Sequence, residues 1–342
     1  MCPDNALKIF YDTKIYIFCP ANAVSGGPDA LHQLAYYLNT LGYTARLVYY
    51  FTGITKCEER FEKYTPQVIR YDEIIDSAEN VVIAPESATW ILKRYKKSRK
   101  CIWWLSDIFY DGYNSRFVSA SKNIIKFFLN IFKAKKYNYA CVQAPIKITK
   151  DIYNFCGSKY VYEKLVNKKL QNIEMLVEPL SLDFLRYGMA ANLSAAERSD
   201  IIAYNPAKPS EIMAKLLQRS DLQFVPIRGM QLSEIIELFR HTKLYVDFGE
   251  FGGPERLPKE SVYNGTCLLV GKRNAAVNDF DVAIPDKYKI ENYNDEETVV
   301  TAMKDVLKNY DQYIDDFQSF RDKVDHLEEN FVKSIKTIFY RV

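Results

Sequence analysis

Short continuous apolar runs alternate along this chain with segments in which apolar residues recur every three or four positions. The first pattern is typical of buried strands, and the second is typical of amphipathic helices. In the first half, the expected strands are residues 14–19, 45–51, 80–84 and 100–105, and the expected helices are residues 28–41 and 87–97. Apolar strands that alternate with helices predict a parallel sheet covered on both faces.

The same alternation restarts near residue 200, after a polar, Ala-rich stretch. There the expected strands are residues 200–204, 222–226, 243–248 and 266–270, and the expected helices are residues 209–218, 231–241 and 258–264. A charged helical stretch follows from residue 309 to about residue 340. This restart predicts a boundary between two domains within residues 183–199.

The predicted fold class is therefore α/β, with two Rossmann-like, doubly wound domains that face each other across a cleft. The expected parts are an N-terminal domain of residues 1–185, a C-terminal domain of residues 186–318, and a terminal helix, residues 319–342, that crosses back to the N-terminal domain. Such domains bind ligands at the carboxyl ends of their strands. Several enzyme classes share this architecture, so the fold alone does not determine the function.

Composition narrows the range of functions. Apolar residues make up 48% of the chain and charged residues 26%, which is typical of a globular protein with a large core. A net charge of only +3 argues against a nucleic-acid partner. The 7 cysteines form no CxxC pair and the 3 histidines no HExxH motif, so we expect no metal and no cofactor. No signal peptide and no membrane-spanning apolar stretch is apparent, which predicts a cytoplasmic location.

A glycine-rich turn separates the first predicted strand from the helix that follows it. Gly26 and Gly27 stand at the start of this helix, where backbone N–H groups attract anions and glycine lets a ligand approach closely. The turn lacks the GxGxxG pattern, and residues 49–51 are aromatic where a dinucleotide-binding domain has an acidic residue. Both a phosphate-binding loop and a simple tight turn explain this segment.

Two carboxylates directly follow predicted strands in the first half. Glu86 follows the strand at 80–84 and Asp107 follows the strand at 100–105. We expect both side chains at the carboxyl edge of the sheet, where either could orient or deprotonate a sugar hydroxyl. Capping of the next segment is an equally good explanation for each. Trp103 and Trp104 precede Asp107 and could stack on a sugar, although one of them is expected in the core.

The most specific segment is residues 245–265, in which a strand runs into a Gly-Gly-Pro turn and then a short helix. The N–H groups of such a turn and helix start suit a diphosphate. Arg256 and Lys259 add positive charge that could neutralise a departing nucleoside diphosphate without a metal. Glu260 could accept hydrogen bonds from ribose hydroxyls.

This segment, DFGEFGGPERLPKES at 247–261, resembles the donor-binding motif of GT-B glycosyltransferases. It is more similar still to bacterial capsule and O-antigen transferases with the pattern DFGxHPGxDRxPREA. The positions that match this pattern are Asp247, Phe248, Gly249, Pro254, Arg256, Pro258 and Glu260. Other motifs of that branch are matched in order by WWLSD at 103–107, YNPAK at 204–208, PIRGM at 226–230 and IPDKYK at 284–289.

The resemblance implies a role for each matched residue. Asn205 and Lys208 would contact the donor phosphates, residues 227–230 would frame the base, and Arg256 and Glu260 would hold the diphosphate and the ribose. The full set of expected donor-binding residues is Gly26, Gly27, Asn205, Lys208, Ile227, Arg228, Gly229, Met230, Gly252, Gly253, Glu255, Arg256, Lys259 and Glu260. The expected catalytic residues are Asp107, Glu86 and Arg256.

The sequence also departs from the family pattern. Phe251 replaces the family's His, Gly252 stands where the wider superfamily often has a second Glu, and Lys259 replaces an Arg. The one DxD triplet, residues 279–281, lies late in the chain, and we expect it to be a solvated turn. Residues 122–136 predict a basic amphipathic helix that either contacts the inner face of a membrane or presents a solvated lysine face.

Together these features predict a metal-independent glycosyltransferase that moves a sugar from a nucleoside diphosphate-sugar to a hydroxyl of a cell-surface glycan. The acceptor is expected to be a glycan or a lipid-linked glycan. A nucleotide-sugar 2-epimerase of the same fold is one alternative, and a non-catalytic sugar-binding or partner subunit is another.

Overall fold

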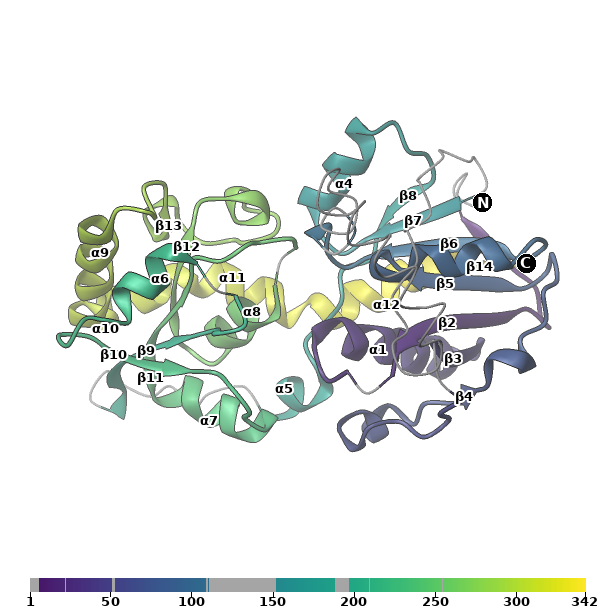
Figure 1. Ribbon diagram of the computed structural model, residues 1–342, viewed down its shortest axis with the longest axis horizontal. Coiled ribbons are helices and arrows are strands. Elements are labelled where there is room, and N and C mark those ends of the chain that lie inside the picture. Colours follow the sequence, from purple (N-terminus) through teal and green to yellow (C-terminus); the bar gives the residue numbers. More distant parts are fainter. Residues whose placement is uncertain are drawn as a thin grey trace, which may run out of the picture. The chain divides into compact units, whose positions relative to one another are not determined.

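The computed structural model shows two compact units (Figure 1). The first unit consists of residues 1–178 and 330–342, and the second unit consists of residues 179–329. The residues described are 6–21, 23–50, 53–108, 110, 152–187, 197–208, 210–253 and 255–342. The segment 122–136, predicted to be a basic amphipathic helix, lies outside these ranges. Within them, no helix is both long and apolar enough to cross a bilayer.

The described residues of the first unit form a seven-stranded parallel sheet in the order β4-β3-β2-β5-β6-β7-β8. The strands are β2 (Lys14–Pro20), β3 (Thr44–Tyr50), β4 (Val68–Ile69), β5 (Val81–Pro85), β6 (Arg99–Trp104), β7 (Ile152–Cys156) and β8 (Ile173–Met175). At the sheet centre Ile17 lies opposite Leu47 on one side and Ile83 on the other. All three side chains are fully buried, as expected for a parallel sheet with both faces covered.

The first unit contains both α-helices and 3-10 helices. Among its described residues before the C-terminal segment they are α1 (Gly26–Thr40), α4 (Lys159–Asn167), η1 (Glu59–Tyr64), η2 (Tyr71–Glu73) and η3 (Glu86–Arg94). The expected helix at 28–41 is α1, whose buried face includes Leu31, Leu34 and Leu38. The expected helix at 87–97 is the 3-10 helix η3, which is interrupted at Ala88 by a non-helical φ of −134°.

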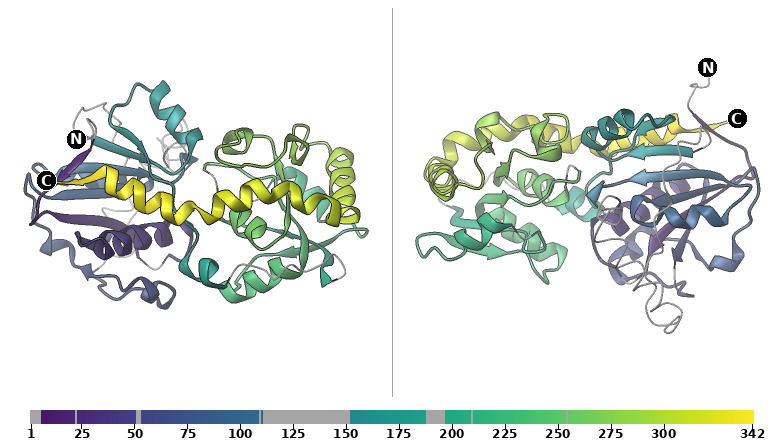
Figure 2. Two further views of the ribbon diagram at one scale, coloured as in Figure 1. Left: turned by 180° about the vertical axis from the view of Figure 1, so that it is seen from behind. Right: turned by 45° about the horizontal axis from the view of Figure 1, so that its top comes forward.

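The C-terminal segment returns to the first unit. It runs through α10 (Tyr310–Tyr313), η7 (Ile314–Phe317), α11 (Gln318–Asp325) and α12 (Leu327–Ile338), and ends in β14 (Phe339–Arg341). Strand β14 pairs in parallel with β1 (Leu7–Ile9) next to the N-terminus (Figure 2). Phe331 stacks on Trp103 with 6.0 Å between ring centroids, which anchors the segment in the core of the first unit.

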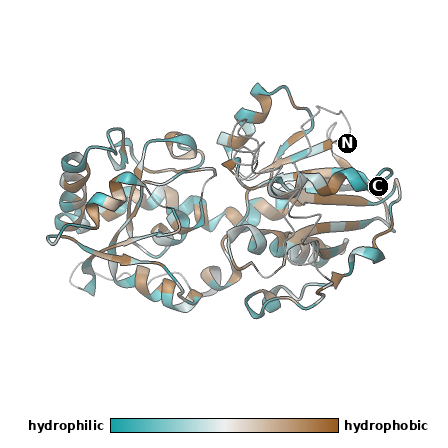
Figure 3. Ribbon diagram, viewed as in Figure 1, coloured by the Kyte–Doolittle hydropathy of each residue, from teal (hydrophilic) through white to brown (hydrophobic). Residues whose placement is uncertain are grey.

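The described residues of the second unit form a five-stranded parallel sheet in the order β10-β9-β11-β12-β13. The strands are β9 (Ser199–Tyr204), β10 (Gln223–Pro226), β11 (Thr242–Asp247), β12 (Cys267–Gly271) and β13 (Lys289–Ile290). Among the described residues before the C-terminal segment, the helices are α5 (Leu182–Tyr187), α6 (Glu211–Leu216), α7 (Leu232–His241), α8 (Arg256–Tyr263), η5 (Asn274–Val277), η6 (Asp286–Tyr288) and α9 (Glu296–Lys308). Strands in both sheets are largely hydrophobic (Figure 3).

A buried arginine fixes the ends of α7 and α8. The Arg198 guanidinium donates hydrogen bonds to the carbonyl oxygens of Phe239 and Thr242, both at 2.9 Å, and of Asn264 at 2.8 Å. Gly265 has φ +77°, and a Cβ there would lie 2.6 Å from the Arg198 guanidinium. Glycine is therefore needed both for the left-handed backbone and for the close approach of the arginine.

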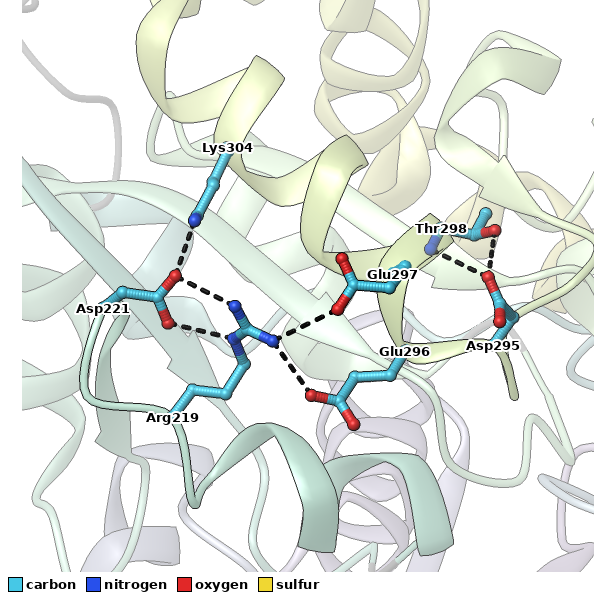
Figure 4. Close-up of polar contacts among 7 residues, drawn as sticks. All are labelled: Arg219, Asp221, Asp295, Glu296, Glu297, Thr298 and Lys304. Atoms are coloured by element: carbon cyan, nitrogen blue, oxygen red, sulfur yellow. Dashed lines mark hydrogen bonds and ion pairs between the residues drawn. The ribbon is translucent and has the colours of Figure 1, made fainter.

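Ion pairs fix α9 to the loop before β10 (Figure 4). Arg219 pairs with Asp221 at 2.9 Å and with Glu296 at 3.0 Å, and Lys304 pairs with Asp221 at 2.5 Å. The side chain of Asp295 caps α9 by accepting a hydrogen bond from the backbone of Thr298. This network lies at the amino ends of the strands, whereas doubly wound sheets bind ligands at the carboxyl ends.

Candidate functional site

Three side chains gather around one lysine beyond the carboxyl ends of β9 and β11. We call Lys208, Asp247, Phe251 and Glu255 the lysine cluster. The Lys208 ammonium lies 3.2 Å from Asp247 Oδ2 and 2.9 Å from Glu255 Oε2, and 4.7 Å from the centroid of the Phe251 ring. The turn at 205–208 places Lys208 directly after β9, and Asp247 is the last residue of β11.

Gly249 allows the lysine to reach this position. Its backbone N–H donates to Asp247 Oδ1 at 3.1 Å, and a Cβ at this position would lie only 2.7 Å from Lys208 Cβ. A larger residue would therefore displace the lysine or the loop. The match of Gly249 to the family pattern thus has a steric reason in this chain.

The lysine cluster carries two carboxylates for one ammonium. Burial raises the pKa of Asp247, while Lys208 acts in the opposite direction. Burial lowers the pKa of Lys208, but Glu255 and Asp247 outweigh burial and the pKa is raised overall. The lysine therefore keeps its charge at neutral pH, although its side chain is only 19% exposed.

The loop from β11 into α8 holds the remaining residues of the predicted glycine-rich motif. Gly252 and Gly253 are buried in this loop. Glu255 stands at the N-cap of α8 with φ +42°, which is rare for a residue other than glycine. Arg256 is half-buried, and its guanidinium donates to the carbonyl oxygen of Pro179 at 3.3 Å.

Lys259 and Glu260 are almost fully buried on α8. Burial lowers the pKa of Lys323 on α11, Asp281 opposes this effect, and Lys259 adds to it. The expectation that residues 279–281 form a solvated turn is wrong for Asp281. It is only 3% exposed and accepts a hydrogen bond from Asn278, because the loop folds its side chain inward.

The other predicted donor-binding residues of the second unit lie at the same edge of its sheet. The side chain of Asn205 accepts a hydrogen bond from the Ala207 backbone at 3.0 Å, which fixes the turn after β9. Residues 227–230 follow β10, the neighbour of β9, and Gly229 has φ +66°. In this stretch Arg228 and Gly229 are exposed, whereas Ile227 and Met230 are half-buried.

Gly26 and Gly27 belong to the first unit, unlike the rest of the predicted donor-binding set. They form the first turn of α1, after the N-cap Ser25. A Cβ at Gly27 would make only ordinary contact, 3.9 Å from Leu105. No close approach therefore requires glycine at position 27 within the part of the chain that the structure describes.

Three carboxyl groups lie beyond the carboxyl ends of β5, β6 and β8 in the first unit. We call Glu86, Asp107 and Glu178 the acidic cluster. All three are more than nine-tenths buried. Glu86 Oε2 accepts a hydrogen bond from the Leu105 backbone at 3.2 Å, and Lys164 on α4 forms an ion pair with Asp107 Oδ2. Asp107 Oδ1 is buried and accepts no hydrogen bond from the described residues.

Burial raises the pKa of Glu86 to about 8, and the charges of Asp107 and Glu178 contribute to this shift. Glu86 is therefore largely protonated at neutral pH. Lys164 and Glu178 were not among the predicted site residues. Lys164 lies on α4, which was not predicted, and Glu178 follows β8, which has only three half-buried residues and gives no clear periodic signal.

Both tryptophans before Asp107 lie in the core. The indole N–H of Trp103 donates to the carbonyl oxygen of Leu176, and that of Trp104 donates to Asn154 Oδ1, each at 3.0 Å. Their exposed fractions are 0% and 1%, so the suggestion that one of them stacks on a sugar is wrong. Across the described ranges, no group of three or more His, Cys, Asp or Glu side chains is arranged to hold a metal ion.

Comparison with known proteins identifies the fold. No family model and no curated protein sequence matches this chain. A structure of T4 phage BGT in complex with UDP-glucose shares 10% identity with a TM-score of 0.52, covering 95% of this chain and 99% of that one. WaaG, a glycosyltransferase involved in lipopolysaccharide biosynthesis, shares 10% identity with a TM-score of 0.51, covering 92% and 99%. Another structure of T4 phage BGT, with UDP and Mn²⁺, shares 10% identity with a TM-score of 0.50, covering 95% and 99%.

These similarities and the two parallel sheets confirm the predicted fold class. The chain has the α/β fold of GT-B glycosyltransferases. At this level of identity the likeness concerns the fold. Activity must therefore be argued from the two clusters of charged residues.

Proposed function

We propose that this protein is a glycosyltransferase that uses a nucleoside diphosphate-sugar as donor and a hydroxyl group as acceptor. The observation that carries the proposal is the Lys208 ammonium, which lies half-buried beyond the carboxyl end of β11, where the absence of a Cβ at Gly249 leaves room for the lysine side chain. Doubly wound sheets bind ligands at this edge, and a charged, partly desolvated lysine there suits an anionic diphosphate. The GT-B fold supports the same donor class.

In this proposal the second unit binds the donor. Lys208, Arg256 and the N–H groups at the start of α8 would hold the diphosphate, and residues 227–230 would lie against the base. As the bond between the anomeric carbon and the diphosphate oxygen breaks, negative charge develops on the leaving group. Lys208 and Arg256 would stabilise that charge, so we propose that transfer does not require a metal.

The first unit supplies the proton acceptor in this proposal. Asp107 Oδ1 accepts no hydrogen bond from the described residues, and Lys164 keeps the other oxygen of the same carboxylate fixed. Asp107 would take the proton of the acceptor hydroxyl while the hydroxyl oxygen bonds to the anomeric carbon. Glu86, protonated at neutral pH, would donate a hydrogen bond rather than compete for that proton.

For the acceptor, we propose a hydroxyl of a cell-surface glycan, free or lipid-linked. The support is the set of ordered motifs between residues 103 and 289 that resemble capsule and O-antigen transferases. WaaG, which shares the fold, is a glycosyltransferase of lipopolysaccharide biosynthesis. Contact of residues 122–136 with a membrane surface and the absence of a nucleic-acid partner remain predictions of the same proposal.

The test measures binding of a panel of nucleoside diphosphate-sugars by calorimetry, and then transfer to glycan acceptors with EDTA or with Mn²⁺. Arg256→Ala is expected to lower turnover about 100-fold, because a charge that stabilises the leaving group is lost. Arg219→Ala, at the opposite edge of the same sheet, is the control and should leave turnover unchanged. Unchanged kinetics in Arg256→Ala would refute this mechanism.

Two further outcomes of the same experiment separate the alternatives. Donor binding without transfer or donor hydrolysis would indicate a non-catalytic sugar-binding subunit. Formation of an epimer from the donor alone would indicate a 2-epimerase. Activity that is lost with EDTA and restored by Mn²⁺ would overturn the proposed metal independence.

A further inference from the structure

The lysine cluster already holds an anion where the proposed diphosphate would bind. Glu255 Oε2 lies 2.9 Å from the Lys208 ammonium, closer than Asp247 Oδ2 at 3.2 Å. With both carboxylates charged, the cluster has one more negative charge than positive charges. A diphosphate that approaches Lys208 would therefore be repelled by the negative charge already present there.

The two carboxylates differ in how firmly they are held. The Asp247 side chain is 2% exposed, and its other oxygen accepts a hydrogen bond from the Gly249 backbone. The Glu255 side chain is 23% exposed and stands in the loop before α8. Glu255 is therefore the carboxylate that can leave the lysine while Asp247 stays.

The backbone conformation of Glu255 supports the same conclusion. Its φ of +42° is unfavourable for a residue with a Cβ, and such backbone persists where surrounding contacts enforce it. The Glu255 side chain also makes no capping hydrogen bond to the first turn of α8, as far as the described residues show. An N-cap side chain normally satisfies those N–H groups, whereas here its carboxylate reaches Lys208 instead.

We propose that the Glu255 carboxylate occupies the phosphate position in the ligand-free protein and is displaced from Lys208 when the donor diphosphate binds. Glu255 is then an internal competitor, which is the opposite of the donor-contacting role that the sequence predicts for it. It keeps the half-buried ammonium paired between turnovers and weakens retention of the released nucleoside diphosphate. The inference rests on the proposed function and concerns the same site.

The experiment compares Glu255→Gln with the wild-type protein and with Glu250→Gln. Glu250 stands five positions earlier in the same loop, is exposed and pairs with Arg273 and Asn274, so this control removes the same charge without touching Lys208. Calorimetry measures the affinity for UDP and, separately, for inorganic pyrophosphate. Glu255→Gln should bind both about tenfold more tightly, a difference of about 1.4 kcal/mol, and Glu250→Gln should stay within about twofold of wild type.

Glu255→Gly provides a second variant, because glycine suits a φ of +42° and also removes the carboxylate. Glu255→Gly should show the same gain in affinity for UDP and pyrophosphate even if Glu255→Gln folds poorly. In a crystal with bound UDP, the Lys208–Glu255 pair should be broken and a phosphate oxygen should lie beside Lys208. Equal or weaker binding in both Glu255 variants would overturn the inference, as would an equal gain in Glu250→Gln.

The pyrophosphate measurement separates this inference from the proposed function. If the Glu255 variants gain affinity for pyrophosphate while no nucleoside diphosphate-sugar binds, the competitor role stands and the proposed function falls. If nucleoside diphosphate-sugars bind to the wild-type protein and the variants show no gain, the proposed function stands and the competitor role falls. If neither ligand binds to any variant, both are overturned.

Discussion

The acidic cluster of the first unit and the lysine cluster of the second unit occupy equivalent places, each beyond the carboxyl ends of parallel strands. The first contains three carboxyl groups near one lysine, Lys164, and the second contains two carboxylates around the half-buried Lys208. In the first, burial and like charges raise the pKa of Glu86 to about 8, so repulsion is relieved by keeping a proton. In the second, repulsion is relieved by pairing with a charged lysine.

This difference shows how one architecture supports two kinds of chemistry. A parallel sheet places the residues that follow its strands at one edge, whatever those residues are. The first cluster is suited to holding or moving a proton, and the second is suited to holding an anion. Variants that affect one property and leave the other intact test whether this division is real.

The largest effect is expected for Asp107→Asn. Loss of this proposed proton acceptor should lower kcat about a thousandfold, because a positioned general base contributes about 10²–10⁴ in rate. The affinity for UDP should not change, since the nucleotide is assigned to the second unit. Steady-state transfer assays and calorimetry measure the two effects. Asp72→Asn, an exposed residue of the same unit, is the control, and a matching loss of UDP affinity in Asp107→Asn would contradict the division.

Glu86→Gln should alter how stability depends on pH. The unfolded chain releases the Glu86 proton above its ordinary pKa of 4.5, whereas the folded protein keeps it up to about 8. Wild-type stability should therefore fall as pH rises through this window, by about 3 kcal/mol between pH 5 and pH 7.5 relative to the variant. Urea unfolding at several pH values measures the difference.

The matched control for this pH prediction is Glu163→Gln. Glu163 is an exposed glutamate on α4, and its substitution should leave the pH dependence of the wild-type protein unchanged. Parallel stability profiles for the wild type and Glu86→Gln would show that Glu86 is ionised in the folded protein. Glu86 would then hold no proton at neutral pH.

Lys208→Ala should affect both binding and stability. Removing the ammonium leaves Asp247 and Glu255 without their shared partner, so unfolding should become easier by about 2 kcal/mol. Affinity for UDP should fall about 100-fold, since a charge-assisted contact to the diphosphate is lost. Lys243→Ala, which breaks a pair with the exposed Asp200, serves as the control. Full UDP affinity in Lys208→Ala would place the nucleotide elsewhere.

A smaller effect is expected for Gly249→Ala. Its new Cβ would lie 2.7 Å from Lys208 Cβ, so the lysine or the loop must shift, and UDP affinity should fall about tenfold. The rate of sugar transfer from the bound donor (kcat) should change less than the affinity for UDP. Gly53→Ala, where a Cβ meets no atom within 4 Å among the described residues, should behave like wild type. An unchanged UDP affinity would show that the exact position of Lys208 is unimportant.

Much of the fold was predictable from the sequence, because the central strands of both sheets are continuous apolar runs. The missed elements lack that signal. Strand β7 contains the buried Asn154, whose amide bonds the indole of Trp104 from 50 positions away, so a polar residue interrupts the apolar run. Strands β1 and β14 have three residues each, which is too few to show a period.

The site was predictable where a motif is local and unpredictable where it depends on distant pairing. The segment that contains Gly249 and Arg256 could be recognised in the sequence as one continuous motif. The ion pair between Lys208 and Glu255 joins a turn and a loop that are 47 positions apart in the sequence. No rule based on residue spacing predicts such a contact. The sequence around Trp103 and Trp104 is the same whether these side chains face a ligand or the core. Their hydrogen bonds to Leu176 and Asn154, which show that both lie in the core, cannot be predicted from the sequence.

The pairing of β1 with β14 has a consequence for the order of biosynthesis. The first unit needs residues 330–342, whereas all residues of the second unit precede them. On the ribosome, the second unit is therefore complete in sequence before the first can close its two-stranded sheet. Until residues 330–342 have been synthesised, strand β1 therefore lacks its partner strand β14, and Trp103 lacks the Phe331 ring that stacks on it.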